Sequence, residues 1–527
     1  MSNVSSKKSI LDGALILSLV GIICKVVGAL YRIPLSHIIQ EEGMATYQHV
    51  FSTYNILLTI SSAGLPVAIS KLVSQYLALD DPRTSRRVFR LALTLLTVLG
   101  LLCTVLMMVF SPQLAQWKRD DNARLGFVTL APSLVLVCML SAYRGFIQGQ
   151  QNMTPTAISQ LIESVGKIFI CLPLAWLGMK TSPALAAAGM FLGTSAAEAV
   201  ALIYIMLTTR RKRPGFLSLP QNPETPVVSD RNLIRQLLSF SFFITVNACV
   251  VPLSQSIDSY MIEGRLINGA GLDALFAKKL YGAYSGYDLT LINVPTAIAT
   301  AIAMSIVPSV SFSKARGDTE NLQRQSHLSL RLSCLIGLPC SVGMAMLSRE
   351  LLTLIYSFSS QEVLNETAAV LSISSLTILA FTLVQSTGGI LNGLKKEWIP
   401  TVTLAAGVGV KILLNYLLIG TPSLAMRGAP IASIACYMIS MIPNLLCVYH
   451  FTGMKPEWKD SLLKPLLCTA LMGMVLWGAK TLLPSGRLVT LVLVVLGVGA
   501  YFGAAFLTKT LTPADLKPFL NRFGKKH

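Results

Sequence analysis

The chain consists mainly of apolar runs of about 20 residues or more, separated by short polar gaps. An α-helix rises about 1.5 Å per residue, so such a run can cross the roughly 30 Å hydrocarbon core of a bilayer. The pattern predicts an all-α integral membrane protein with about fourteen transmembrane helices. We expect these spans at approximately 10–36, 44–79, 88–110, 124–147, 154–178, 183–209, 232–262, 276–312, 325–348, 366–393, 398–420, 427–451, 460–482 and 487–508.

Composition agrees with a multi-pass membrane protein. Hydrophobic residues make up 53% of the 527 residues and charged residues only 13%. The net charge of +19 comes mostly from Lys and Arg in the polar gaps, which is typical of span orientation and does not indicate a nucleic-acid partner. The ten cysteines show no C-x-x-C spacing and the five histidines form no ligand cluster in the sequence. We therefore expect no metal site, no cofactor and no enzymatic activity.

The distribution of basic residues predicts the orientation. If the N-terminus is cytoplasmic, Lys and Arg are more than twice as frequent in the inner gaps as in the outer ones. This bias predicts a cell membrane protein with both termini in the cytoplasm. The first apolar run is longer than the hydrophobic region of a signal peptide and lacks an A-x-A-like cleavage site, so we expect it to stay as the first span.

Two halves of the chain resemble each other. Three residues recur at a constant offset of 244: Gly145, Gly149 and Lys167 match Gly389, Gly393 and Lys411. A second echo pairs Asp80 with Asp318 at an offset of 238. Parallel repeats of this kind are typical of transporters.

The longest polar interruption, "TTRRKRPGFLSLPQNPETPVVSDRN" at 208–232, is rich in Pro and charge and separates these halves. We therefore predict an N-lobe of six helices at 1–209, a cytoplasmic linker at 210–231 and a C-lobe of six helices at 232–451. Two additional helices follow at 452–508, and a cytoplasmic tail occupies 509–527.

Several ionisable residues fall inside the predicted spans. Each costs about 2.5–3.5 kcal/mol at the centre of a bilayer, so each is a candidate to line a cavity. In "GIICKVVGALYR", Lys25 and Arg32 are seven residues apart, nearly two helical turns, and share one face with Gly28. The alternative for both cations is that they extend to the outer headgroups.

Further charges lie deep in other spans. Glu163 and Lys167 are four residues apart, which suits either a self-neutralising pair or a cavity role. Lys411 has no acid three or four residues away, so it needs a partner elsewhere or an anionic substrate. The intramembrane acids Asp258 and Glu198 are possible partners or coupling-ion ligands. Arg144 ends a span on the cytoplasmic side, where an anchoring role explains it.

We therefore assign a substrate-binding cavity to Lys25, Arg32, Glu163, Lys167, Asp258 and Lys411, and a coupling or structural role to Glu198 and Arg144.

The stretches "YRGFIQGQQNMTPTAISQLIE", "KVVGALYRIPL", "SSAGLPVAISKLVSQY" and "IDSYMI", followed by "LYGAY" and "SIVPSVS", resemble a known family. They are similar to the polysaccharide-exporter branch of the multidrug/oligosaccharidyl-lipid/polysaccharide (MOP) superfamily, and within it to the stage V sporulation protein B and MurJ-type lipid II flippase families. The resemblance implies a V-shaped MurJ/MATE-like fold of fourteen helices and alternating access. It also implies a cationic cavity for the pyrophosphate and sugar head of an undecaprenyl-linked intermediate, and a lipid-tail groove formed by the last two helices. Lys25 and Arg32 fall where such flippases have first-helix arginines.

The function expected from this resemblance is a flippase for lipid II or a related lipid-linked glycan, with peptidoglycan biosynthesis or sporulation as the setting. Its partners would be the lipid-linked anionic precursor, membrane lipids and cell-wall synthases. An ion gradient or membrane potential would drive it, with the ion unidentified. Two alternatives stay open. A MATE-type cation-coupled drug antiporter would need an acid-dominated cavity and usually twelve spans, and a non-transporting scaffold for cell-wall or spore-cortex synthesis would use the buried charges only to hold helices together.

Overall fold

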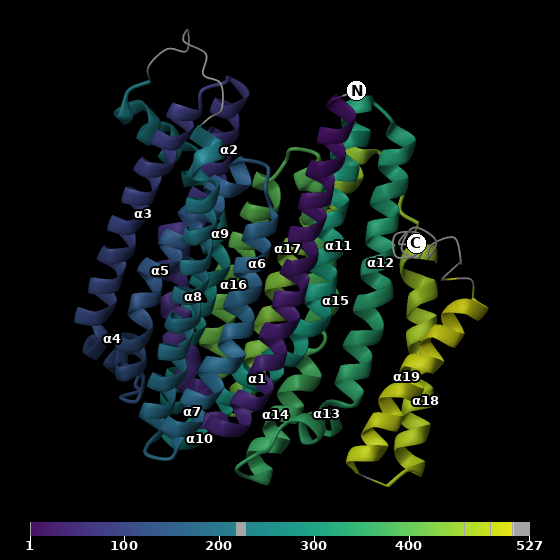
Figure 1. Cartoon of the computed structure of the whole chain (residues 1–527). Helices are drawn as coiled ribbons and strands as arrows, with labels where there is room; N and C mark the ends of the chain where they lie inside the picture. Colours follow the sequence, from purple (N-terminus) through teal and green to yellow (C-terminus); the bar gives the residue numbers. More distant parts are fainter. Residues whose placement is uncertain (1, 218–227, 458, 485, 509, 511–527) are drawn as a thin grey trace. The chain divides into compact units, whose positions relative to one another are not determined.

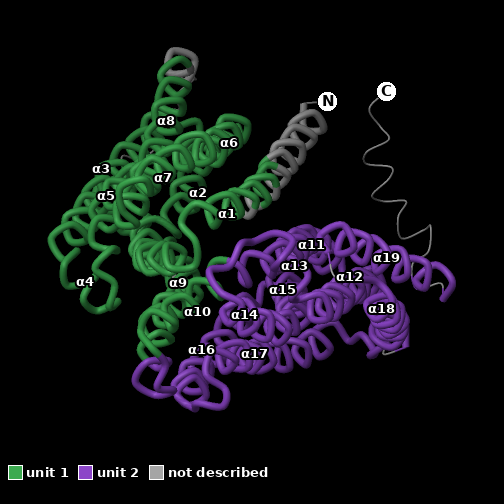
Figure 2. The backbone as a smooth tube through the Cα atoms, turned by 90° about the horizontal axis from the view of Figure 1, so that it is seen from below, with its two compact units in different colours: residues 1–264, 273–286 green, residues 265–272, 287–527 purple. Residues whose placement is uncertain are grey.

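The computed structural model describes residues 2–217, 228–457, 459–484, 486–508 and 510, with side chains except at 2–16, 18, 19, 22, 25, 29, 212–217 and 243. The described residues form helices and no β-strand (Figure 1). They divide into two compact units (Figure 2). Unit 1 comprises residues 1–264 and 273–286, and unit 2 comprises residues 265–272 and 287–527.

The helices of unit 1 cover the N-terminal half of the sequence and a short later segment. They are α1 (Ser2–Ser62), α2 (Leu65–Ala78), α3 (Pro82–Val109), α4 (Ser111–Trp117), α5 (Ala123–Gly149), α6 (Thr154–Gly166), the π-helical turn η1 (Lys167–Cys171), α7 (Leu172–Met179), α8 (Pro183–Leu217), α9 (Asp230–Asn268) and α10 (Ala274–Ala283). The last residues of α9 already belong to unit 2.

Unit 2 holds the remaining helices. They are α11 (Leu289–Arg316), α12 (Thr319–Met346), α13 (Ser348–Ile355), α14 (Gln361–Ser374), α15 (Thr377–Gly393), α16 (Trp398–Ile419), η3 (Ala425–Arg427), α17 (Gly428–Thr452), η4 (Lys459–Leu463), α18 (Lys464–Leu482) and α19 (Arg487–Leu507). A second π-helical turn, η2 (Tyr284–Asp288), leads into α11.

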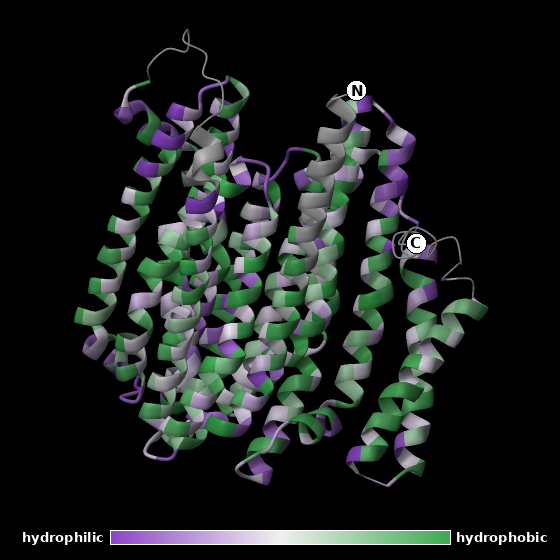
Figure 3. Cartoon of the chain, in the orientation of Figure 1, coloured by the Kyte–Doolittle hydropathy of each residue, from purple (hydrophilic) through white to green (hydrophobic). Residues whose placement is uncertain are grey.

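The described helices are those of a multi-pass membrane protein. Twelve are long and apolar enough to cross a membrane, or up to thirteen if the bent pair Asp230–Phe242 and Ile244–Asn268 is one span. Figure 3 shows hydrophobic residues along the middle of the helices and hydrophilic residues near their ends, for example at the start of α3 and of α12. The all-α membrane fold is confirmed, whereas the predicted number of fourteen spans is not.

The difference in number arises near the N-terminus. Most of the predicted spans 10–36 and 44–79 falls in one apolar stretch, Val26–Ala78. Within it, Gln40 has a non-helical backbone (φ 54°, ψ −166°), and α1 gives way to α2 after Ser62. Gln40 falls in the gap 37–43 between the two predicted spans, so the helical segments on either side of it agree with that prediction.

The repeated glycines have the same structural role in both units. A Cβ atom on Gly145 of α5 would lie 2.7 Å from the carbonyl oxygen of Pro66 in α2. In unit 2, a Cβ atom on Gly389 of α15 would lie 2.7 Å from the carbonyl oxygen of Ala303 in α11. The second glycines repeat this one turn later, Gly149 against Val73 and Gly393 against Val310. Only glycine lets these backbones approach so closely, which agrees with the repeat predicted from the sequence.

The second echo needs a correction of one residue. The Asp81 carboxylate caps α3 by accepting the Thr84 backbone N–H at 2.9 Å, and the Asp318 carboxylate caps α12 by accepting that of Asn321 at 3.0 Å. Asp80 and Gly317, which precede the two caps, have φ of 56° and 69°. Asp81 is therefore the counterpart of Asp318, because its position allows it to satisfy the free N–H groups at a helix start.

The segments around the predicted linker and tail are only partly described. Helix α8 continues to Leu217 and α9 begins at Asp230, so helix extends into the predicted linker 210–231 from both sides, and 218–227 lie outside the described residues. Of the predicted tail 509–527, only Thr510 is described. The C-terminal helices α18 and α19 pack on α12 and α13, where the Tyr501 hydroxyl donates to the Leu335 carbonyl at 2.8 Å. Their lipid-tail role stays a prediction.

Candidate functional site

Three charged side chains meet in unit 1, and we call Arg144, Glu163 and Lys167 the triad. The Glu163 carboxylate accepts from Lys167 Nζ at 2.9 Å and, through its other oxygen, from an Arg144 terminal nitrogen at 3.1 Å. Arg144 Nε also donates to Ser159 Oγ at 2.9 Å. Two cations therefore share one carboxylate inside the predicted spans.

Helical spacing brings the triad together. Ser159, Glu163 and Lys167 follow one another at intervals of four residues, so they lie on one face of α6 and its continuation. At Lys167 the helix changes to the π-helical turn η1, a feature that is frequent at functional sites. The side chains of Arg144, Glu163 and Lys167 are 14%, 21% and 31% exposed, so a ligand can reach the cations without unfolding the site.

A buried acid of unit 1, Glu198, interacts electrostatically with the triad. Glu198 of α8 is 2% exposed, and its oxygens accept from Ser133 of α5 and, at 3.5 Å, from the Tyr54 hydroxyl of α1. The Tyr54 and Ser133 hydroxyl oxygens are 2.7 Å apart. Three helices are thus joined by hydroxyl contacts to one acid.

Four further residues, Lys25, Arg32, Asp258 and Lys411, were predicted to line the cavity. The Arg32 guanidinium lies 5.4 Å from the ring centroid of Tyr47, a cation–π contact within unit 1. The Lys25 side chain lies outside the described residues. Asp258 is half-buried on α9 in unit 1, and Lys411 is half-buried on α16 in unit 2. Among the predicted site residues, Arg144, Glu163 and Lys167 contact one another. That these residues bind a substrate stays a prediction.

Arg144 has partners that the sequence analysis did not name. Its cytoplasmic anchoring and its coupling or structural role stay predictions, and its side chain contacts Glu163 and Ser159. The partners come from another helix, so the spacing within its own helix gives no sign of them.

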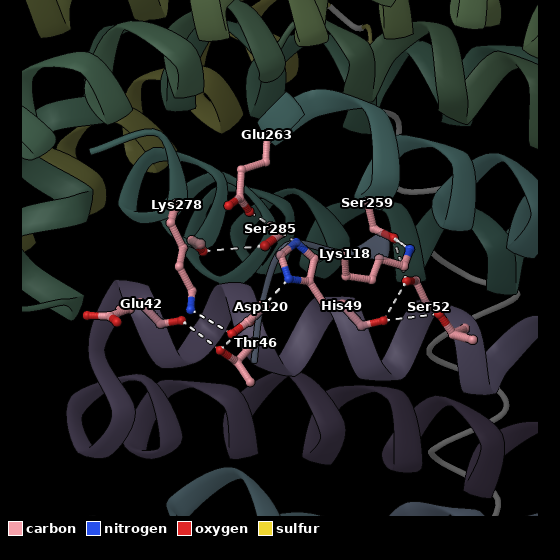
Figure 4. A network of polar contacts seen from close by, with 12 residues as sticks. Glu42, Thr46, His49, Ser52, Lys118, Asp120, Ser259, Glu263, Lys278 and Ser285 are labelled. Atoms are coloured by element: carbon pink, nitrogen blue, oxygen red, sulfur yellow. Dashed lines mark hydrogen bonds and ion pairs between the residues drawn. The ribbon is translucent and has the colours of Figure 1, made fainter. Parts of the chain in front are cut away.

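A second polar group in unit 1 was not predicted (Figure 4). We call it the His49 cluster: His49, Asp120, Glu263 and Lys278. His49 Nδ1 lies 3.3 Å from Asp120 Oδ2, and His49 Nε2 lies 3.3 Å from Glu263 Oε2. Lys278 Nζ donates to the other Asp120 oxygen at 2.8 Å, and the Thr46 hydroxyl donates to Asp120 Oδ2 at 2.6 Å.

Asp120 and Lys118 precede α5 and lie outside the spans. Burial raises the pKa of Asp120, but the hydrogen bond from His49 and the Lys278 ammonium outweigh it and hold that pKa well below its usual value. Burial lowers the pKa of Lys118 to about 7. Among the described residues, no group of three or more His, Cys, Asp or Glu side chains could hold a metal ion.

Comparison with known proteins shows which family the chain resembles. The sequence profile of a family described as "Polysaccharide biosynthesis protein" matches residues 10–314, more than half of the chain, and a MatE profile matches residues 283–417. The lipid II flippase MurJ of Bacillus subtilis (strain 168) is 27% identical over 469 residues, which cover 85% of this chain and 84% of that protein. Stage V sporulation protein B of the same strain is 26% identical, with 81% of each chain covered.

A solved structure shares the fold. The lipid II flippase MurJ in an inward closed conformation matches with a TM-score of 0.70 and covers 94% of this chain and 98% of its own. At 12% sequence identity, that likeness establishes the fold alone.

Proposed function

We propose that this chain, which belongs to the polysaccharide biosynthesis protein family of the MOP superfamily, is a flippase. It moves a lipid-linked anionic glycan precursor, either lipid II or a related undecaprenyl-pyrophosphate-linked glycan, from the inner to the outer leaflet of the cell membrane. Alternating access of two lobes carries out the movement, driven by an ion gradient or the membrane potential. Both termini lie in the cytoplasm. The similarity to the flippase MurJ over most of both chains supports this choice.

The triad is the observation that carries the proposal. Arg144 and Lys167 share the carboxylate of Glu163, and the buried Glu198 interacts electrostatically with both cations without contacting them directly. The direct contacts therefore pair two cations with one acid. A cation inside a membrane span is costly unless it has a function or a partner. A pyrophosphate supplies the missing negative charge, and charge-assisted hydrogen bonds from Arg and Lys are among the stronger contacts available for it.

Each member of the triad then has a distinct part. The Arg144 guanidinium is held by Ser159 and Glu163, which fixes its planar fork for phosphate oxygens. Lys167, with 31% of its side chain exposed, presents a compact charge on a flexible stem. Glu163 orients both cations. Its negative charge also weakens their attraction for the pyrophosphate, so that the substrate can be released.

The drug-antiporter alternative has one observation in its favour, the MatE profile over residues 283–417. An antiporter for organic cations needs an excess of acid in its cavity. The triad has the opposite balance. Drug susceptibility of cells that express the chain tests this alternative directly: lowered susceptibility to cationic drugs, with no flippase activity, would favour antiport.

Complementation tests the leading proposal. A strain depleted of its own lipid II flippase receives the wild-type chain or the variant Lys167→Gln. We expect growth with the wild type and loss of growth with the variant at equal membrane levels. The matched control is Lys180→Gln, because Lys180 follows the same helical segment but its amine lies 3.6 Å from the Trp176 ring centroid, outside the triad.

The outcomes separate the possibilities. Growth with Lys167→Gln would show that the triad does not bind the substrate. Failure of the wild-type chain to restore growth would exclude lipid II and leave another lipid-linked glycan, drug antiport or a scaffold.

A further inference from the structure

His49 is enclosed between two acids. Its side chain is fully buried, and those of Asp120 and Glu263 are 1% and 6% exposed. Each ring nitrogen lies 3.3 Å from a carboxylate oxygen. The ring face stacks on Tyr281 of α10, with centroids 5.1 Å apart and an interplanar angle of 15°.

This arrangement requires a proton. A neutral imidazole has one N–H donor and one acceptor nitrogen, whereas imidazolium donates from both. A neutral His49 would therefore place a nitrogen lone pair against a carboxylate at 3.3 Å, in a buried site where repulsion is weakly screened. His49 Nε2 and Glu263 Oε2 have no hydrogen-bond partner of good geometry, so the second contact is an ion pair that the ring can strengthen or release.

The charge balance leads to the same conclusion. In the cluster, Asp120 and Glu263 carry two negative charges and Lys278 one positive charge. One further proton on His49 makes the cluster neutral, and its loss leaves a buried negative charge. Lys118 lies next to the cluster, but its amine contacts only neutral groups, Ser259 Oγ and the Ser256 carbonyl.

The surrounding elements carry other titratable groups. These are Glu41 and Glu42 on α1, Arg119 and Asp121 beside Asp120, Asp258 on α9, and Lys279, Tyr281 and Tyr284 at α10 and η2. Asp120 and Glu263 lie against the two nitrogens of the His49 ring, and Tyr281 stacks on its face. The ring is thus set between the acid before α5, the acid on α9 and the aromatic face of α10.

We propose that His49 binds a proton that holds α9 and α10 against α1, and that release of this proton loosens the contact during the transport cycle. Protonated His49 bridges Asp120 and Glu263. When the proton leaves to solvent, His49 keeps its hydrogen bond to Asp120, and the lone pair of its other nitrogen repels Glu263. The contact between His49 of α1 and Glu263 of α9 therefore weakens. The site lies at the predicted outer ends of these helices, where an opening would release substrate. The binding of the proton rests on the geometry alone, whereas its part in transport rests on the proposed function.

A metal ion fits this site less well. The Lys278 ammonium already occupies the cation position at Asp120. Among the described residues, no group of three or more His, Cys, Asp or Glu side chains has a geometry that could hold a metal ion. The coupling ion that suits these side chains is therefore the proton.

Nitrogen NMR of the full chain in lipid bilayers, labelled with ¹⁵N-histidine, tests proton binding. The His49 signal is the one that disappears in His49→Gln. We expect it to report two protonated ring nitrogens at pH 7, and we expect the Nε2 signal to change in Glu263→Gln, which removes the carboxylate 3.3 Å from that nitrogen. His37→Gln is the matched control, because His37 is an exposed histidine of the same helix, and it should leave the His49 signal unchanged.

Two results would overturn the proposal: a neutral His49 ring in the wild type at pH 7, or an unchanged His49 signal in Glu263→Gln. A transport measurement tests the second part. In proteoliposomes that flip labelled lipid II, the wild-type rate should change with a pH gradient and the His49→Gln rate should not. A wild-type rate that ignores the gradient would refute coupling. An absence of any flipping would instead refute the proposed function, because the NMR result does not depend on it.

Discussion

Replacing Glu163 with glutamine removes the one negative charge that Arg144 and Lys167 share. Glutamine keeps the size of the side chain and one acceptor oxygen, so the change is mainly electrostatic. Both cations then face each other without a carboxylate between them. We expect the folded state of unit 1 to lose stability.

The magnitude follows from burial. Breaking a buried ion pair costs about 3–5 kcal/mol, while exposed pairs contribute about 0.2–1 kcal/mol. The triad side chains are only 14–31% exposed, so we expect a loss near the lower buried value, about 3 kcal/mol. For a domain of a few hundred residues, 1 kcal/mol corresponds to about 2 °C in Tm, which gives a decrease of about 6 °C.

The chain offers a matched control. Arg427 and Glu366 form a pair of the same length, 3.0 Å, but their side chains are 40% and 36% exposed. Glu366→Gln should lower Tm by about 2 °C or less. Thermal unfolding in detergent, followed with a thiol-reactive dye, measures both, because buried thiols such as Cys138 in unit 1 and Cys436 in unit 2 become accessible on unfolding. Equal shifts for the two variants would refute the argument that burial makes the triad stabilising.

Three further predictions use the same measurement. Gly145→Ala and Gly389→Ala should each lower the free energy of unfolding by about 1–3 kcal/mol, because the added methyl group meets a carbonyl oxygen of the facing helix. Gly28→Ala is the control and should not lower it, because no atom lies within 4 Å of the new methyl group. Asp81→Ala should lower the free energy of unfolding by about 1 kcal/mol, because it removes a helix cap. Asp80→Gly should not lower it, because Asp80 has a positive φ, which glycine adopts readily. A larger loss of stability for Asp80→Gly than for Asp81→Ala would contradict the assignment of Asp81 as the counterpart of Asp318. Burial lowers the pKa of Lys118 to about 7, so on raising the pH the folded chain loses this proton at a lower pH than the unfolded chain does. The unfolded chain therefore binds more protons between pH 7 and pH 9, and the stability of the wild type should rise over this range. The rise should be smaller in Lys118→Met.

The fold could be predicted from the sequence because its main determinant is local. The length and polarity of each run decide whether it can span a bilayer, and the glycine spacing at Gly145 and Gly149 marks close helix contacts whose partners repeat at Gly389 and Gly393. The break at Gln40 lies in the gap 37–43 predicted between the first two spans, whereas the single residue at which the backbone turns could not be predicted, because it depends on one pair of backbone dihedral angles.

The triad was predictable in part. The pairing of Glu163 with Lys167 follows from their spacing of four residues on one helix. The contact of Arg144 with Glu163 does not, because it depends on how α5 lies against α6. A rule based on position alone places Arg144 at a membrane interface, and only the packing of the two helices shows that its charge turns inward.

The His49 cluster shows which signal the sequence did contain. His49 and Glu263 lie far apart in the chain, so no spacing connects them, and a single histidine in a span carries little information. The positive-inside bias is more informative, because it makes cations scarce at the predicted outer ends. Lys118 and Lys278 both lie there: Lys118 donates to Ser259, whereas Lys278 forms an ion pair with the buried Asp120. A cation on the side that is poor in them is therefore a signal for a buried acid in the case of Lys278, and Asp120 in turn contacts His49.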